Sequence, residues 1–355
     1  MKIAHIHVWD KKNKGDHGIV LSVHDILKNA FPGCTIFDFP LETLKSPTEK
    51  SIKRINRTDM VVIGGGGILY RYFTPYNITG IKKITPPIVI FGVGYIRETG
   101  SKAMNSMEKK SVFALMRRAR LVSVRDYYTK QFLQKIGVPT KKIGLIGDPA
   151  VFLEKKEVRN PLLEKPGMKI GLNLNYSGWL GFGKYEHAIL SSYENLAKRL
   201  QKNGGRIFYA MHHPDERKIL KKLRIRDMEI LDYGAKEQMY AYSKLDIVIG
   251  MMLHSVVMSF GAGTPEVNVG YDIRNKNFAK FIHCPELVIG TENLTPDLLF
   301  SRVRHVIKHK NEYQKKFQKR KNSIWKLHEN YIKKIKDEIR NQKGLHTGQV
   351  RNYRA

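Results

Sequence analysis

Short apolar runs alternate with helix-length segments along most of the chain, and this alternation limits the fold more than any other feature of the sequence. The first set of predicted strands is Ile3–Val8, Met60–Ile63, Ile88–Gly92, Leu121–Val124 and Ile143–Ile146. A second set follows at Lys169–Leu174, Arg206–Ala210, Met228–Leu231, Ile247–Gly250 and Glu266–Val269. Apolar strands separated by stretches long enough for crossover helices are typical of parallel α/β sheets.

A charged stretch without periodicity, EKKEVRNPLLEKPG at 154–167, separates the two sets and predicts a linker. The length of 355 residues also favours two domains. We therefore expect two α/β domains, residues 1–153 and 168–300, with parallel sheets that face each other across a cleft. Ligands of open parallel sheets bind beyond the carboxyl ends of the strands, so the motifs that follow strands are the candidate site.

The chain is strongly basic, with 63 Lys and Arg against 32 Asp and Glu and a formal net charge of +31. Apolar residues recur at spacings of three, four and seven in its C-terminal part, at Phe317, Ile324, Leu327, Tyr331, Ile335 and Ile339. This pattern predicts an amphipathic helix over 301–343 with a basic outer face, followed by a disordered tail at 344–355. The basic face is either a solvated surface or a contact for anionic membrane or a polyanionic glycan. Nucleic acid is disfavoured as a partner because no nucleic-acid-binding motif is present.

The sequence also limits location and metal binding. No apolar run reaches the roughly 20 residues that span a bilayer. The N-terminal segment MKIAHIHVWD has an apolar stretch that is too short for a signal peptide. We therefore expect a cytoplasmic protein that is at most peripheral to the membrane. Cys34 and Cys284 match neither a disulfide framework nor a zinc spacing. His212 and His213 are adjacent, so they point in different directions, and no third ligand is suitably spaced. We predict no metal site.

Glycine turns follow the predicted strands of the first domain. In Asn13-Lys14-Gly15-Asp16, free helix amides can bind an anion or a sugar hydroxyl, and Asp16 is either a hydroxyl acceptor or an ordinary N-cap. Gly64–Gly67 and Gly92–Gly94 would let a ligand approach the backbone closely, although they match no nucleotide-binding fingerprint. The acceptor-side candidates are Asn13, Gly15, Gly65, Gly66, Gly94 and, from the second domain, His212.

Cations and one histidine follow other strands. Arg125 is either a bidentate clamp for an anion or a structural partner of Asp126. His254 interrupts the apolar run GMMLHSVVMSFGAGTP, just before a short buried helix predicted at Ser255–Gly261. At a helix N-terminus an imidazole can bind an anion or transfer a proton, although a lone histidine in an apolar run is also typical of a core residue. Arg274 and Lys276 follow the next strand and add two cations.

In their order along the chain, these motifs resemble the polysaccharide pyruvyl transferase family. The matching segments, in chain order, are NKGD, IGGGGIL, FGVGY, VSVRDYYTKQFLQKIG, IGDPAVF and LHSVVMSFGAGTPEVNVGYDIRNK. The resemblance covers nearly everything up to about residue 282. It implies a GT-B-like pair of Rossmann-like domains, the first on the acceptor side and the second on the donor side.

The resemblance also implies an activity, which is transfer of pyruvate from phosphoenolpyruvate onto a sugar as a ketal. This reaction requires no redox cofactor and no obligatory metal. The matching positions place Arg125, His254 and Lys276 in an anionic donor site, with Arg274 as a substitute for Lys276 and Ser255 at the same helix start. His254 is the candidate general acid, and Asp16 is the candidate acceptor for a sugar hydroxyl.

One position departs from the family pattern. Where the family has Arg-Leu-His, this chain has Met252-Leu253-His254, which removes a cation from the expected donor site. Two alternatives therefore remain: a GT-B-like glycosyltransferase with a nucleotide-sugar donor, and a glycan-binding relative without catalysis. Arg274 and Lys276 could also compensate for the missing charge.

Overall fold

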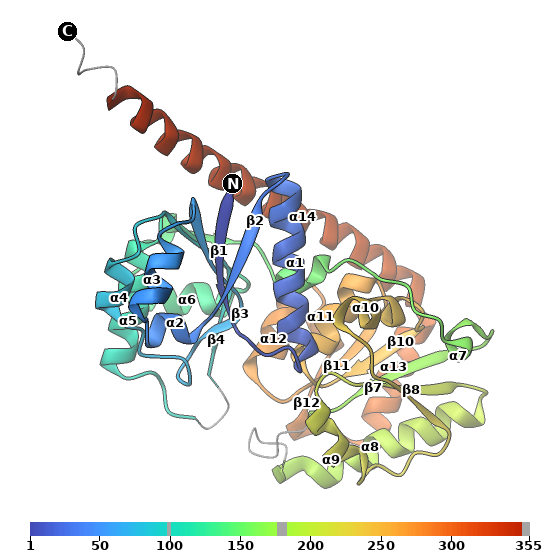
Figure 1. Cartoon of the computed structure of the whole chain (residues 1–355). Helices are drawn as coiled ribbons and strands as arrows, with labels where there is room; N and C mark the ends of the chain where they lie inside the picture. The colour runs from blue at the N-terminus through green and yellow to red at the C-terminus, as the bar shows by residue number, and fades with distance from the viewer. Residues whose placement is uncertain (98–100, 176–182, 350–355) are drawn as a thin grey trace.

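The computed structural model describes residues 1–97, 101–175 and 183–349, the side chains after residue 341 excepted. Within these residues the chain forms two α/β domains that stand side by side, each built on a six-stranded sheet (Figure 1). All strand pairings are parallel. The predicted fold class is therefore confirmed.

The first sheet has the strand order β2-β1-β3-β4-β5-β6. Its strands are β1 Lys2–His7, β2 Thr35–Pro40, β3 Met60–Tyr70, β4 Ile88–Ile96, β5 Leu121–Val124 and β6 Ile143–Leu145. Its helices are α1 Lys14–Ala30, α2 Glu42–Lys45, α3 Glu49–Ile55, α4 Ile78–Lys82, α5 Ser106–Arg118 and α6 Tyr127–Lys135. Strand β2 was not predicted, because it is an edge strand whose residues are mostly exposed or half-buried and form no continuous apolar run.

The second sheet has the strand order β12-β11-β10-β7-β8-β9. Its strands are β7 Lys169–Asn173, β8 Arg206–Ala210, β9 Met228–Leu231, β10 Ile247–Gly250, β11 Glu266–Gly270 and β12 Val288–Gly290. Its helices are α7 Pro161–Glu164, α8 Gly183–Lys202, α9 Arg217–Leu220, α10 Ala235–Ser243, α11 Leu253–Ala262, α12 Ile273–Phe281 and α13 Pro296–Lys308. The short edge strand β12 was also missed. Helix α7 lies inside the predicted linker and buries Leu163 in the core of the second domain.

The glycine run of the first domain continues β3 instead of forming the predicted turn. Gly64, Gly65 and Gly66 have φ angles of 120°, 74° and 85°, which favour glycine, and the pairing of β3 with β4 shifts register just after them. A Cβ on Gly65 would lie 2.3 Å from Ile19 Cγ2. Gly65 therefore allows α1 to pack closely on the sheet.

The basic C-terminal region forms two helices, because the chain breaks at His309 between α13 and α14, Lys310–Gln349. Helix α14 crosses both domains (Figure 1): the rings of Phe317 and Phe260 lie 4.9 Å apart, and Tyr331 Oη donates to Ile90 O at 2.6 Å. The predicted apolar stripe is confirmed, with Phe317, Ile324, Tyr331 and Ile335 buried. Residues 344–349, predicted as disordered tail, continue the helix, and 350–355 lie outside the described residues. No helix in the described ranges is long and apolar enough to cross a bilayer.

Candidate functional site

The candidate site lies where the strand order of each sheet reverses. In the first sheet this point is between β1 and β3, and in the second it is between β7 and β10. Helix α1 follows β1, helix α11 follows β10, and the two helices contact each other across the domain boundary. Crevices at such switch points are the usual ligand sites of open parallel sheets.

The NKGD turn forms the first turn of α1. Asn13, and not Asp16, is the N-cap, and its side chain accepts hydrogen bonds from the amides of Gly15 at 3.1 Å and Asp16 at 3.3 Å. A Cβ on Gly15 would lie 2.1 Å from Nδ1 of His254. Gly15 is therefore the point where the two domains place α1 and α11 in direct contact.

We expect Gly15→Ala to reduce activity strongly while the protein remains folded. The added methyl would overlap the imidazole of His254 and displace it, whereas alanine itself suits a helix better than glycine. Gly18→Ala on the same helix is the matched control, since its Cβ would meet Leu153 Cδ2 at 3.2 Å and Ala235 Cβ at 3.7 Å, and not His254. Steady-state turnover and thermal melts of both variants check this prediction, and equal activities would contradict it.

His254 is the second residue of α11, and its side chain is 12% exposed. Its Nε2 is buried, has no hydrogen-bond partner within the described part of the chain, and lies 3.8 Å from Asp148 Oδ2. Burial, Arg125 and Arg274 together lower the pKa of His254 to about 3, so the imidazole is neutral at pH 7. A buried nitrogen without a partner is costly, which argues against a satisfied core histidine.

Arg125 is buried at the end of β5 among acidic side chains. Its Nη1 lies 3.0 Å from Asp148 Oδ2, and its Nε lies 3.5 Å from Asp126 Oδ2. A Cβ on Gly94 would lie 2.2 Å from the Nε of Arg125, so this glycine makes room for the guanidinium and not for a ligand. Asp148 caps a turn by accepting from Ala150 N at 3.0 Å.

Asp16 and Arg274 complete the charged cluster. Burial and the neighbouring Asp10 raise the pKa of Asp16 to about 6, against the opposing effect of Arg125 and Arg274. The Nε of Arg274 donates to Asp272 Oδ2 at 2.6 Å, and its Nη2 donates to Tyr271 Oη at 3.0 Å. A small pocket joins both arginines; its lining is Arg125, Asp126, Asp148, Leu253, Val257, Arg274, Phe278 and Phe281.

The predicted site residues outside this cluster include Lys276, Ser255 and His212. Lys276 is exposed and pairs with Glu292 at 3.1 Å, beside a neighbouring pocket. Ser255 is fully buried, and its hydroxyl donates to Met252 O at 2.7 Å. His212 is also fully buried, with its Nε2 2.6 Å from the hydroxyl of Tyr242.

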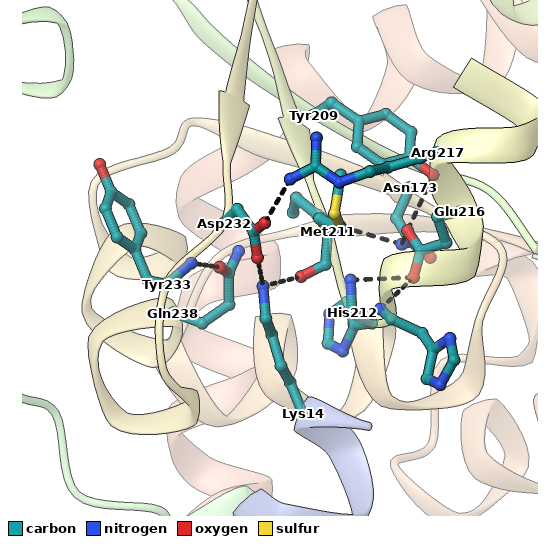
Figure 2. A network of polar contacts seen from close by, with 12 residues as sticks. Lys14, Asn173, Tyr209, Met211, His212, Glu216, Arg217, Asp232, Tyr233 and Gln238 are labelled. Carbon is teal, nitrogen blue, oxygen red and sulfur yellow. Dashed lines mark hydrogen bonds and ion pairs between the residues drawn. The ribbon is translucent and has the colours of Figure 1, made fainter. Parts of the chain in front are cut away.

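Lys14, which was not among the predicted site residues, attaches the NKGD turn to the second domain (Figure 2). Its Nζ donates to Met211 O and to Asp232 Oδ1, both at 2.6 Å, and its backbone amide donates to His212 O at 2.9 Å. A cation at a helix N-terminus is unfavourable, so its position in the motif already signalled an acidic partner elsewhere. Beside it, Glu216 accepts the amides of His212 and His213, and burial raises the pKa of Glu216 to about 8.

A family model described as polysaccharide pyruvyl transferase matches residues 13–273. No curated protein matches the chain.

Several solved structures share the two-domain fold. A putative UDP-N-acetylglucosamine 2-epimerase from Listeria monocytogenes has 12% identity and a TM-score of 0.62, over 89% of this chain and 90% of that one. UDP-GlcNAc 2-epimerase from Neisseria meningitidis, bound to UDP-GlcNAc, has 11% identity and a TM-score of 0.59, over 95% and 100%. HepE from Anabaena, in complex with UDP and glucose, has 10% identity and a TM-score of 0.57, over 95% and 100%. At these identities the likeness shows a shared GT-B-like fold.

Proposed function

Since this chain belongs to the polysaccharide pyruvyl transferase family, we propose that it transfers a pyruvyl group from phosphoenolpyruvate onto a sugar of a glycan or glycan precursor as a ketal. One observation carries the proposal. The buried Nε2 of His254 has no hydrogen-bond partner in the described chain and lies in the field of Arg125 and Arg274, at the contact between the domains. Two arginines and the first turn of α11 suit a ligand with a phosphate and a carboxylate.

The proposed reaction begins with protonation of the methylene carbon of phosphoenolpyruvate, which places positive charge on the adjacent carbon. One sugar hydroxyl attacks that carbon and loses its proton. The carbon–oxygen bond to phosphate then breaks, and a second hydroxyl of the same sugar attacks to close the ketal. One hydroxyl proton replaces the proton delivered to the methylene carbon, the other leaves with inorganic phosphate, and no redox step occurs.

His254 is the proposed general acid, although it is neutral at pH 7 in the free protein. A bound dianion would offset the charges of Arg125 and Arg274, and a nearby anion raises the pKa of a histidine. The proton would therefore become available only with the donor in place. This coupling limits protonation to the complex that can react.

Asp16 is the proposed acceptor for a sugar hydroxyl proton. With a pKa of about 6 it is mostly ionised at pH 7, yet remains a stronger base than an ordinary aspartate. General bases with a pKa close to the working pH are the most effective. Gly15 places Asp16 on the same helix turn that contacts His254.

The proposal is tested by titrating the full chain calorimetrically with phosphoenolpyruvate and, separately, with a panel of nucleotide sugars. Acceptor sugars are then added, and inorganic phosphate and the mass of the sugar product are measured. Saturable phosphoenolpyruvate binding, with phosphate release that depends on an acceptor, is the expected result. Binding of a nucleotide sugar without any binding of phosphoenolpyruvate would replace the proposal by the glycosyltransferase alternative.

Met252 gives a second test of the donor. It is half-buried at the N-cap of α11, and its side chain makes no capping bond. With phosphoenolpyruvate as donor, Met252→Arg is expected to leave donor affinity unchanged or to tighten it, because the family's cation returns beside His254. Met107→Arg is the matched control, since Met107 is 68% exposed on α5. Weaker phosphoenolpyruvate binding by Met252→Arg alone, measured by calorimetry, would indicate a pocket remodelled for another donor.

A further inference from the structure

Four side chains that can bind a metal converge in the first domain, outside the cleft site. They are His5 and His7 of β1, His24 of α1 and Asp38 of β2, and their ligand atoms all lie within 4.8 Å of one another. Strands β1 and β2 are neighbours, with Asp38 directly opposite His5 in the register, and α1 lies beside them (Figure 1). His5 and His7 are two residues apart in a strand and so share one face.

The distances suit a single ion. Asp38 Oδ1 lies 3.1 Å from His7 Nε2, 2.9 Å from His24 Nε2 and 3.9 Å from His5 Nδ1. His24 Nε2 lies 3.1 Å from His5 Nδ1. Four ligands in a tetrahedron around zinc, at zinc–nitrogen distances of about 2.0–2.1 Å, are separated by roughly 3.3 Å. These four separations differ from that value by at most about 0.6 Å, and all the ligand atoms lie within 4.8 Å of one another.

Hydrogen bonds on the far side of two rings determine where their lone pairs point. His5 Nε2 lies 2.9 Å from Gly64 O, and His7 Nδ1 lies 2.8 Å from Val8 O. A carbonyl oxygen only accepts, so these nitrogens carry the hydrogens, and His5 Nδ1 and His7 Nε2 direct lone pairs into the cluster. Metal-binding histidines almost always have such a partner on the other nitrogen.

With these tautomers, no positive charge lies between His7 and the carboxylate of Asp38. The lone pair of His7 Nε2 faces a carboxylate oxygen of Asp38 at 3.1 Å. Both atoms are acceptors, so they repel unless a cation lies between them. That cation is either a proton on the imidazole or a metal ion, and the convergence of two more imidazole nitrogens on the same point favours the metal.

We propose that His5, His7, His24 and Asp38 bind one divalent transition-metal ion of the zinc class. Four protein ligands close the coordination sphere, which is typical of structural zinc sites, so we assign the ion a structural role and not one in catalysis. It would join β1, β2 and the middle of α1. Because α1 carries Gly15 and Asp16 at its start, the ion would also hold the acceptor side of the cleft in position. Asp38 and His24, with side chains 33% and 16% exposed, form the entry side.

The test uses the full chain, stripped with a chelator and then dialysed against zinc chloride. Elemental analysis is expected to give one tightly held zinc ion per chain, and zinc is expected to raise the melting temperature of the stripped protein. Replacement by Co²⁺ is expected to give the intense visible bands of a tetrahedral cobalt site. His24→Gln and Asp38→Asn are expected to lose the ion, the bands and the thermal shift. Both residues lie at the exposed side of the cluster, and circular dichroism checks that the variants fold.

A matched control addresses adventitious binding. His305, which is exposed, and His309, which is half-buried, form a pair with ring centroids 4.3 Å apart, and such a pair can bind zinc weakly. The double variant His305→Ala/His309→Ala is expected to keep the tight ion. Stoichiometric zinc that disappears in this double variant, or persists in His24→Gln and Asp38→Asn, would overturn the proposal. So would the absence of both bound zinc and cobalt bands in the wild-type chain, which would leave a proton as the cation between His7 and Asp38.

Discussion

Replacing His254 by asparagine is expected to lower turnover on the order of 10²-fold or more, the usual effect of losing a general acid. Asparagine keeps the polarity of the side chain but cannot deliver a proton. The melting temperature is expected to change little, because the buried Nε2 makes no hydrogen bond within the described chain that the substitution would break. Single-turnover release of phosphate from phosphoenolpyruvate, with acceptor present, measures the effect.

The control for His254→Asn is His283→Asn. His283 is exposed, and its φ of 63° is an angle that asparagine tolerates well. Full turnover by the His254→Asn variant would show that His254 is a core histidine with no part in the chemistry. The pH profile of turnover adds a second readout. The wild-type rate is expected to fall at high pH, as donor-bound His254 deprotonates, and to fall below about pH 6, as Asp16 becomes protonated.

Replacing Arg125 by methionine is expected to affect both stability and donor binding. Asp148 would remain buried without the Nη1 contact at 3.0 Å, and breaking a buried ion pair in this way costs about 3–5 kcal/mol of unfolding free energy. The phosphate or carboxylate of the donor would lose its guanidinium partner as well. We expect binding of phosphoenolpyruvate to weaken by at least about 30-fold, since losing one member of a buried charge pair costs about 2 kcal/mol or more.

A second variant separates these two effects. Arg125→Met/Asp148→Asn also removes the charge of Asp148, while asparagine can still accept from Ala150 N and cap the turn. The double variant is expected to recover most of the unfolding free energy that Arg125→Met loses, whereas its affinity for phosphoenolpyruvate is expected to remain low. Recovery of donor affinity together with stability would show that Arg125 is purely structural. Chemical denaturation and calorimetry on the three proteins decide between these outcomes.

Much of the fold could be predicted because its signals are local. Buried parallel strands are continuous apolar runs, and β8, β9 and β10 have the predicted bounds. The missed strands β2 and β12 are edge strands, where exposure or shortness weakens the apolar pattern. The break at His309 was not predicted because the basic and apolar periodicity continues across it.

The candidate site was only partly predictable. Arg125, Asp16, Arg274 and His254 follow strand ends, and the fold places them in one cluster because parallel strands deliver their carboxyl ends to the same edge. Lys276 follows the same strand as Arg274 but faces Glu292 instead, since residues two apart on a helix point in different directions. Gly65 and Gly94 were expected to admit a ligand, yet they admit Ile19 and Arg125.

The sequence alone determined the two parallel α/β domains, the amphipathic C-terminal region and the chemical character of the strand ends, because periodicity and turn chemistry act over a few residues. Only the tertiary structure decided which side chains meet. Gly15 touches His254 and Lys14 reaches Asp232 across the domain boundary. His5, His7, His24 and Asp38 converge from three elements with no motif in common. Such contacts depend on how whole domains and layers pack, and no local pattern in the chain encodes which distant residues come together.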